Sequence, residues 1–250
     1  MKRRVYGKQA VREAMRGRAP LHILCVSEKA TQGLTELLDL AKHQGVELRI
    51  CPESQLDALA QGGRHQGVVG IGGEFPYLDL EVMVSECPNK SPFFIALDEL
   101  TDPHNFGAIV RTAVCLGLDG MIIPRHRAAP VSGAVVRAAA GATEHARIAR
   151  VTNLGKALCL LRENYGFEIV GLDAASDVQI NSINSTRNGQ VLVVGSEGKG
   201  LRRLVREACD VLVRIDMAGP VASLNASVAA AIAMYQLNQS KLDNSQVDNT

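Results

Sequence analysis

The sequence predicts an α/β protein built around a parallel β-sheet with helices on both faces. Six short apolar runs in the second part of the chain alternate with segments of helical periodicity. These runs are almost continuously apolar, which is typical of strands buried on both faces of a parallel sheet. The length of 250 residues also leaves room for a second, smaller domain, which we place at the N-terminus.

The first domain is expected to span residues 1–73 and to form a compact α/β unit. Helices and strands alternate in its pattern. The predicted elements are a helix from Gly7 to Met15, a strand at 21–28, a helix at 34–45, a strand at 46–53, a short helix from Ser54 and a strand at 67–73. Residues 74–91 lack periodicity and are rich in turn residues, so we predict a linker there.

The second domain is expected to span residues 92–239 and to hold the parallel sheet. Its six strands are predicted at 93–100, 120–124, 146–151, 167–174, 190–197 and 211–217. A last helix is predicted from about Leu224 to Asn238. The polar residues 240–250 that follow are expected to be a disordered tail.

Composition narrows the class of protein. With 46% apolar and 21% charged residues, and no apolar run long enough to cross a bilayer, we expect a globular cytoplasmic protein without a membrane partner. The basic N-terminus has no apolar segment behind it and so does not resemble a secretory signal. The six cysteines form no C-x-x-C pair, and nearby histidines are not at zinc-ligand spacing, so we expect reduced thiols and no metal.

Positive charge is concentrated at the N-terminus. The formal net charge is only +1, yet residues 1–18 hold seven lysines and arginines against a single acid, Glu13. Phosphate binding depends on such local clusters rather than on the total, so this asymmetry favours a nucleic-acid partner. A solvated basic helix face explains the same residues equally well.

Three loops follow the carboxyl ends of predicted strands, where open α/β sheets bind their ligands. The first, 97–113, enters a helix that Asn105 is expected to cap, with Arg111 further along the same helix. The second, 193–204, is rich in glycine and contains Glu197, but it fits neither a Walker A loop nor a dinucleotide fingerprint. The third, 214–235, carries Ser223 and Asn225, which are plausible helix caps, before an alanine-lined helix.

In this order the three loops resemble the signature motifs of the SPOUT superfamily, in its SpoU/TrmH branch of RNA 2′-O-ribose methyltransferases. NFGAIVRTA is similar to the first motif, GSEGKGLRRL to the second and IDMAGPVASLNASVA to the third. The N-terminal domain is similar to the RNA-binding domain of the members that act on ribosomal RNA, which has an L30-like fold. This similarity rests on Tyr6-Gly7 and on HQGVVG. The resemblance covers roughly residues 5–238, and we find no departure at a position that the family uses.

The resemblance implies a deep trefoil knot at the C-terminal end of the sheet and a homodimer packed through the knotted region. It implies that S-adenosyl-L-methionine is the cofactor, contacted at Gly195, Ile215 and Leu224, with Leu172 and Gly198 as further neighbours. It assigns the active site to Asn105, Arg111, Glu197, Ser223 and Asn225. The substrate it implies is a guanosine of 23S ribosomal RNA, in the peptidyl-transferase-centre region.

The implied reaction needs a ribose 2′-hydroxyl held in line with the methyl group. A guanidinium stays protonated in a protein, so we expect Arg111 to hold a phosphate and stabilise charge on the 2′-oxygen rather than to act as a base. Glu197 and Asn225 are expected to order the loops. Other readings remain open: the same chemistry on tRNA or another ribosomal site, a catalytically silent RNA-binding assembly protein, or a nicotinamide-dependent oxidoreductase, which the misplaced glycine loop disfavours.

Overall fold

The computed structural model describes residues 3–183, 188–220 and 223–247, and it divides into two compact units. The first unit is Met1–Pro76 together with Phe106–Arg111 and Ala129–Ala146. The second is Tyr77–Asn105, Thr112–Ala128 and Arg147–Thr250. The segment Ala129–Ala146 therefore groups with the first unit, although the sequence places it inside 92–239.

The first unit is built on a mixed four-stranded sheet with the strand order β1-β4-β2-β3. Strands β2 and β3 pair in parallel, whereas β4 pairs antiparallel with both β1 and β2. Its strands are β1 (Arg3–Tyr6), β2 (Leu21–Ser27), β3 (Glu47–Cys51) and β4 (Val68–Gly72). Its helices are α1 (Lys8–Arg16), η1 (Glu28–Gly33), α2 (Thr35–His43), α3 (Glu53–Ala60), α6 (Gly133–Ala138) and η2 (Ala142–Glu144).

A buried ion pair holds the first unit together. Arg3 of β1 donates from Nη1 to Glu144 Oε1 at 2.6 Å and to Oε2 at 2.9 Å. Its Nη2 donates to the carbonyl of Ala19 at 2.8 Å. The Arg3 and Glu144 side chains are only 2% and 1% exposed. Because water cannot stabilise either charge, each is stabilised by the opposite charge of its partner.

The second unit is built on an all-parallel six-stranded sheet with the order β10-β8-β9-β5-β6-β7, which confirms the predicted fold class. Its strands are β5 (Phe93–Leu97), β6 (Gly120–Pro124), β7 (Ile148–Val151), β8 (Glu168–Leu172), β9 (Gln190–Val194) and β10 (Val211–Val213). Its helices are α4 (Leu80–Ser85), α7 (Leu154–Tyr165), η3 (Ile180–Ser182), α8 (Arg203–Glu207) and α9 (Ala226–Val247), and α5 (Pro103–Cys115) runs through both units.

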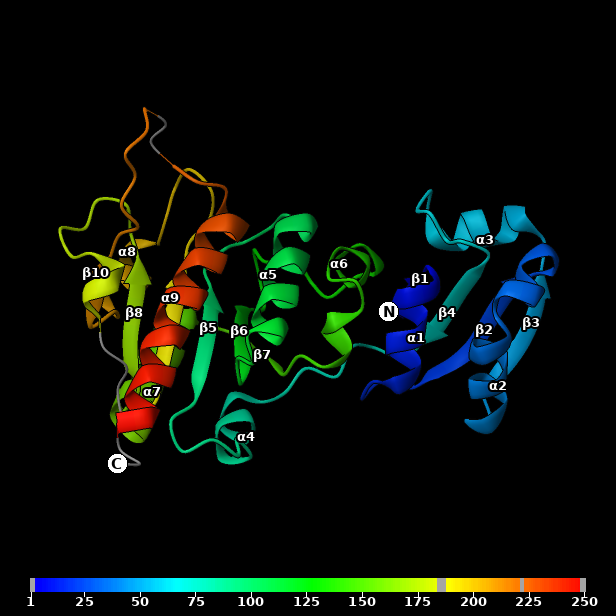
Figure 1. The fold of residues 1–250 in the computed structure, drawn as a ribbon, viewed down its shortest axis with the longest axis horizontal. Helices are drawn as coiled ribbons and strands as arrows, with labels where there is room; N and C mark the ends of the chain where they lie inside the picture. Colours follow the sequence, from blue (N-terminus) through cyan, green and yellow to red (C-terminus); the bar gives the residue numbers. More distant parts are fainter. Residues whose placement is uncertain (1–2, 184–187, 221–222, 248–250) are drawn as a thin grey trace. The chain divides into compact units, whose positions relative to one another are not determined.

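Helices cover the sheet because its strands are apolar on both faces. All residues of β5, β6 and β9 are buried. A core cluster joins residues of α4, α7 and α8 to the sheet, while α9 lies along the sheet beside β9 (Figure 1). Asn238 of α9 donates to the carbonyl of Leu116 at 3.0 Å, which joins α9 to the end of α5.

Most predicted strands are trimmed at their ends, and four differences are larger. The pattern missed β1, and the expected linker 74–91 contains α4, whose first turn is capped by the Asp79 side chain. The expected tail 240–250 is helical to Val247, since no proline or glycine interrupts it, and residues 248–250 lie outside the described part. The predicted knot involves residues 221–222, which the structure does not describe, so the knot stays a prediction. The fourth difference, at the start of α5, bears on the site.

No helix within residues 3–183, 188–220 and 223–247 is long and apolar enough to span a membrane.

Candidate active site

A pocket of about 640 Å³ opens at the carboxyl ends of β8, β9 and β10. Its volume lies within the range usual for sites that hold small molecules and cofactors. The segments that form it are the end of β8, the β9–α8 loop, the chain after β10 and the start of α9. All five residues expected to contact the cofactor line it: Leu172, Gly195, Gly198, Ile215 and Leu224.

Glycine is required where the β9–α8 loop folds back on itself. A Cβ placed on Gly195 would lie 2.2 Å from the backbone carbon of Gly200, closer than real Cβ contacts ever come. Ser196 and Gly200 exchange backbone hydrogen bonds at 3.0 and 3.2 Å, which close this turn. Gly198 and Gly200 both have positive φ, 75° and 64°, a conformation that costs glycine least. The loop therefore presents backbone rather than side chains to part of the pocket.

A hydrogen-bonded cluster of Asn105, Glu197 and Asn225 lies at this pocket and joins the three loops singled out in the sequence. Asn105 Nδ2 donates to Glu197 Oε1 at 2.9 Å, and Asn225 Nδ2 donates to the same oxygen at 2.6 Å. Asn225 Nδ2 also lies 3.0 Å from Asn105 Oδ1. The backbone N–H of Ala226 is the third donor to Glu197 Oε1, at 3.3 Å. One carboxylate oxygen thus binds the first turn of α5 and the start of α9 to the β9–α8 loop.

The caps at the two helix starts are not both as predicted. Asp102, not Asn105, caps α5: its carboxylate accepts from the N–H groups of His104 and Asn105 at 3.3 and 2.9 Å. The Asn105 side chain is thereby left to bond Glu197. Asp102 precedes Pro103 at the first helical position, a combination that marks helix starts and is visible in the sequence. Asn225 does cap α9, because its Oδ1 accepts from the N–H of Ser227 at 2.9 Å.

The two remaining predicted residues do not join this cluster. Ser223 lines the pocket and is exposed, and it has no hydrogen bond to another residue of the described chain. Arg111 is exposed on α5 and is not among the residues that line the pocket. It stands six residues after Asn105, which turns it about 120° around the helix axis from Asn105.

Sequence reasoning missed Asp98, which anchors the far end of the β9–α8 loop. Its side chain is 0% exposed and accepts from the backbone N–H of Arg202 at 2.8 Å and from Arg202 Nε at 2.7 Å. This carboxylate raises the pKa of the Arg202 guanidinium. The signal that could have found it is an acid directly after the buried strand β5, where a charge needs a partner.

Comparison with known proteins assigns both parts of the chain. Residues 92–235 match the model of the SpoU rRNA Methylase family, and residues 4–78 match that of the RNA 2′-O ribose methyltransferase substrate-binding domain. The chain is 42% identical over 236 residues to YacO of Bacillus subtilis (strain 168), which is named as a TrmH family tRNA/rRNA methyltransferase. That match covers 93% of this chain and 94% of the relative.

Two solved structures resemble this one along different lengths. The SpoU methyltransferase AviRb from Streptomyces viridochromogenes, in complex with AdoMet, superposes with a TM-score of 0.81 at 25% identity, covering 97% of this chain and 91% of that one. A TrmH/SpoU tRNA modifying enzyme of A. aeolicus reaches a TM-score of 0.55 at 27% identity and covers 66% of this chain and 84% of that one. On these matches, the chain belongs to the SpoU/TrmH family of RNA 2′-O-ribose methyltransferases.

Proposed function

We propose that this chain transfers a methyl group from S-adenosylmethionine to the ribose 2′-hydroxyl of a guanosine in 23S ribosomal RNA, in the peptidyl-transferase-centre region. The observation that carries the proposal is the meeting of three distant loops in one Asn105–Glu197–Asn225 cluster beside a cofactor-sized pocket.

The pocket fits S-adenosylmethionine, the cofactor of this family. Leu172, Ile215 and Leu224 supply apolar surface for a nucleoside, and the glycines of the β9–α8 loop leave backbone groups accessible to polar atoms. When bound, the cofactor supplies an activated methyl group. Glu197 reaches the same pocket, and its bonds to Asn105 and Asn225 hold the loop that forms one wall.

The residues of the chain must align the ribose and ease the loss of its proton. Ser223 lines the pocket without another hydrogen bond among the described residues, so its hydroxyl is available to the substrate. Arg111 makes no hydrogen bond or ion pair within the described chain. We assign it to a phosphate and to the negative charge that develops on the 2′-oxygen, because a guanidinium is a poor proton acceptor.

A homodimer gives Arg111 of one copy a route to the pocket of its partner. Helix α9 leaves Val228, Ile232 and Tyr235 exposed at 46%, 41% and 54%, and their spacing of four and three residues places them along one face. We infer that this face packs against a second copy.

The dimer is tested by light scattering. Ile232→Glu should give monomers, whereas the control Lys156→Glu, at an exposed position on α7, should stay dimeric. A monomeric wild type would refute the dimer.

Ribosomal RNA is favoured over tRNA by the N-terminal substrate-binding segment, since the A. aeolicus tRNA enzyme matches only 66% of this chain. Lys8, Arg12 and Arg16 lie on α1 of this segment, although Arg12 and Arg16 share an ion pair with Glu36. Their charges would contribute to a phosphate-binding face.

The substrate is tested with methyl-labelled cofactor and separated 23S, 16S and transfer RNA from cells that lack the gene for this chain. We expect label in 23S RNA alone. Label in tRNA or 16S RNA would keep the chemistry and reject the assignment to 23S RNA, and label in none, with the cofactor bound, would favour a silent assembly protein.

A further inference from the structure

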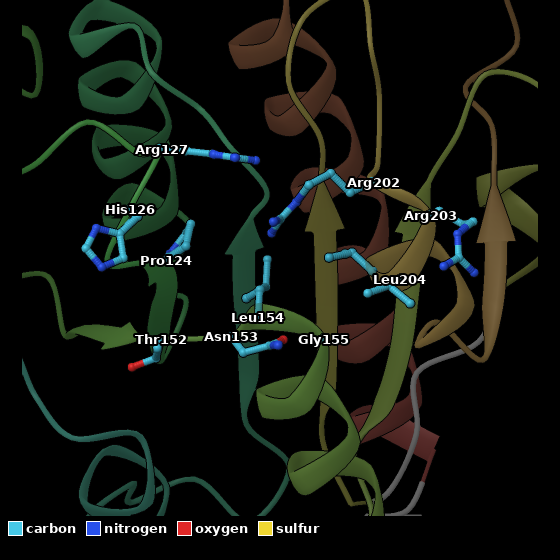
Figure 2. Close-up of a pocket in the computed structure, with 11 residues that line it drawn as sticks. Pro124, His126, Arg127, Thr152, Asn153, Leu154, Gly155, Arg202, Arg203 and Leu204 are labelled. Atoms are coloured by element: carbon cyan, nitrogen blue, oxygen red, sulfur yellow. The ribbon is translucent and has the colours of Figure 1, made fainter.

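A second pocket, of about 390 Å³, lies in the same unit at the carboxyl ends of β6 and β7. Its walls come from the segment after β6, the first turn of α7 and the start of α8 (Figure 2). Arg127, Arg202 and Arg203 line it together with His126, and no acidic residue lines it. None of the five residues expected at the cofactor lines this pocket.

Two backbone N–H groups in the wall of this pocket have no acceptor among the described residues. The N–H of Lys156 is capped by Asn153 Oδ1 at 3.1 Å, but those of Leu154 and Gly155 have no acceptor within residues 3–183, 188–220 and 223–247. Both residues are buried, and Leu154 is 1% exposed. They are the first two N–H groups of α7, which no intrahelical carbonyl can reach, so they are available to an anion that enters the pocket.

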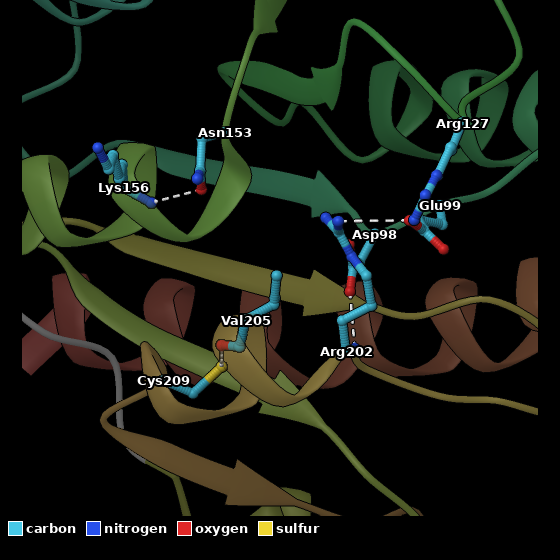
Figure 3. Close-up of polar contacts among 8 residues, drawn as sticks. All are labelled: Asp98, Glu99, Arg127, Asn153, Lys156, Arg202, Val205 and Cys209. Carbon is cyan, nitrogen blue, oxygen red and sulfur yellow. Dashed lines mark hydrogen bonds and ion pairs between the residues drawn. The ribbon is translucent and has the colours of Figure 1, made fainter.

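The arginines differ in how far they are already engaged. Arg202 is held by Asp98 and Glu99, as Figure 3 shows, and Glu99 also accepts from Arg127 at 3.1 Å. Among the described residues, Arg203 pairs with Glu207 alone, one turn along α8. The Arg127 and Arg203 side chains are 75% and 76% exposed, and surface pairs of this kind contribute little free energy. Both can therefore turn to an incoming anion at small cost.

The two pockets share one loop. Residues Val194–Gly200 of the β9–α8 segment line the cofactor pocket, and Arg202–Val205 of the same segment line the second pocket. A group bound in the second pocket is therefore held against the segment that carries Glu197. This arrangement places the second pocket within reach of a polymer whose reacting unit occupies the first.

We propose that the second pocket binds a phosphate of the RNA backbone, away from the nucleotide that is methylated. The inference rests on the proposed function, since it takes RNA as the substrate. A phosphate matches the pocket because its several oxygens accept from guanidinium groups and from two adjacent backbone N–H groups at a helix start. Apolar ligands would leave those two donors without an acceptor.

The anion site is tested first without RNA or activity. Inorganic phosphate is titrated into the full chain and the backbone amide resonances are followed by NMR. The signals of Leu154 and Gly155 should shift with saturation in the wild type and much less in Arg203→Ala. Shifts that are equal in both proteins, or absent from both, would overturn the site.

RNA binding is then measured by fluorescence anisotropy with 23S RNA fragments over a series of salt concentrations. Arg203→Ala and Arg127→Ala should each weaken binding by about tenfold. Each should also lower the slope of log affinity against log salt by about 0.7, the value for one phosphate contact on a single strand. The matched control is Lys90→Ala, which should change neither quantity. Lys90 is an exposed cation just before the amino end of β5, whereas the pocket lies at the carboxyl ends of the strands.

Glu99→Gln provides a change of opposite sign. It removes the carboxylate that competes for Arg127 and Arg202, so RNA should bind more tightly. Phosphate binding that leaves RNA affinity equal in Arg203→Ala and Lys90→Ala would mean that the pocket takes a free anion, which overturns the RNA assignment. The affinity for S-adenosylmethionine should stay unchanged in all these variants. A failure of the phosphate site can therefore be told apart from a failure of the proposed function, which would show in the cofactor pocket.

Discussion

Replacing Glu197 tests whether its cluster organises the site. Its Oε1 accepts three hydrogen bonds, from Asn105, Asn225 and the N–H of Ala226. Bonds to a charged group contribute about 1.5–3 kcal/mol each, against about 0.5–1.5 for neutral ones. Glu197→Gln keeps an acceptor oxygen but loses the charge, which costs about 1 kcal/mol per bond before solvent screening.

Solvent reaches Glu197 and Asn225, so we halve that sum to about 1.5 kcal/mol, equivalent to about tenfold in the population of the ordered cluster. Glu197→Ala removes the acceptor and leaves the buried Asn105 amide unpaired, for a total of about 3 kcal/mol. Single-turnover methyl transfer should therefore fall about tenfold for Gln and on the order of 10² for Ala.

The control is Glu163→Gln, on the exposed face of α7, which should transfer at the wild-type rate. Circular dichroism and chemical denaturation establish that each variant is folded under the assay conditions. Equal rates for the wild type and both Glu197 variants would refute the reasoning, because the cluster would then order nothing that the reaction needs.

Three further predictions concern other parts of the chain. Glu144→Ala leaves Arg3 buried without a counter-charge, so the free energy of unfolding, measured with denaturant, should fall by about 3–5 kcal/mol. Wild-type stability in this variant would contradict the buried pair. Burial, with the nearby charge of Asp210, raises the pKa of the Cys209 thiol to about 12. At pH 8 iodoacetamide should therefore leave Cys209 unmodified while it labels the exposed Cys115. Mass spectrometry measures the labelling, and rapid labelling of Cys209 would contradict its burial. Arg111→Ala should lose about 10² to 10³ in single-turnover rate with cofactor affinity nearly intact, and an unchanged rate would reject its role.

The parallel sheet could be predicted because its strands are long apolar runs whose pattern depends on burial alone. β6 was predicted with its observed bounds, Gly120–Pro124. β1 could not be predicted in this way, since Arg3–Tyr6 is short and half basic, and its pairing with β4 is about 65 residues distant. From the sequence alone Arg3 is expected to be a surface charge, because its partner Glu144 lies 141 residues away along the chain.

The geometry of the site could not be predicted from the sequence, and the catalytic roles of its residues stay predictions. The resemblance named Asn105, Glu197 and Asn225, and the structure shows that one carboxylate oxygen joins all three loops. Helix periodicity placed Arg111 on the same helix as Asn105, but Arg111 is not among the residues that line the pocket. Asp98 was missed because its partner, Arg202, lies 104 residues away and only folding brings them together.

The most direct test of the central claim is the chemical identity of the product. Purified chain, methyl-labelled S-adenosylmethionine and 23S RNA are incubated, and the RNA is digested to nucleosides and separated by chromatography with mass spectrometry. The account predicts label in 2′-O-methylguanosine, at one position of the RNA. Label on a base, or on no nucleoside despite cofactor bound at the Gly195–Leu224 pocket, would contradict it.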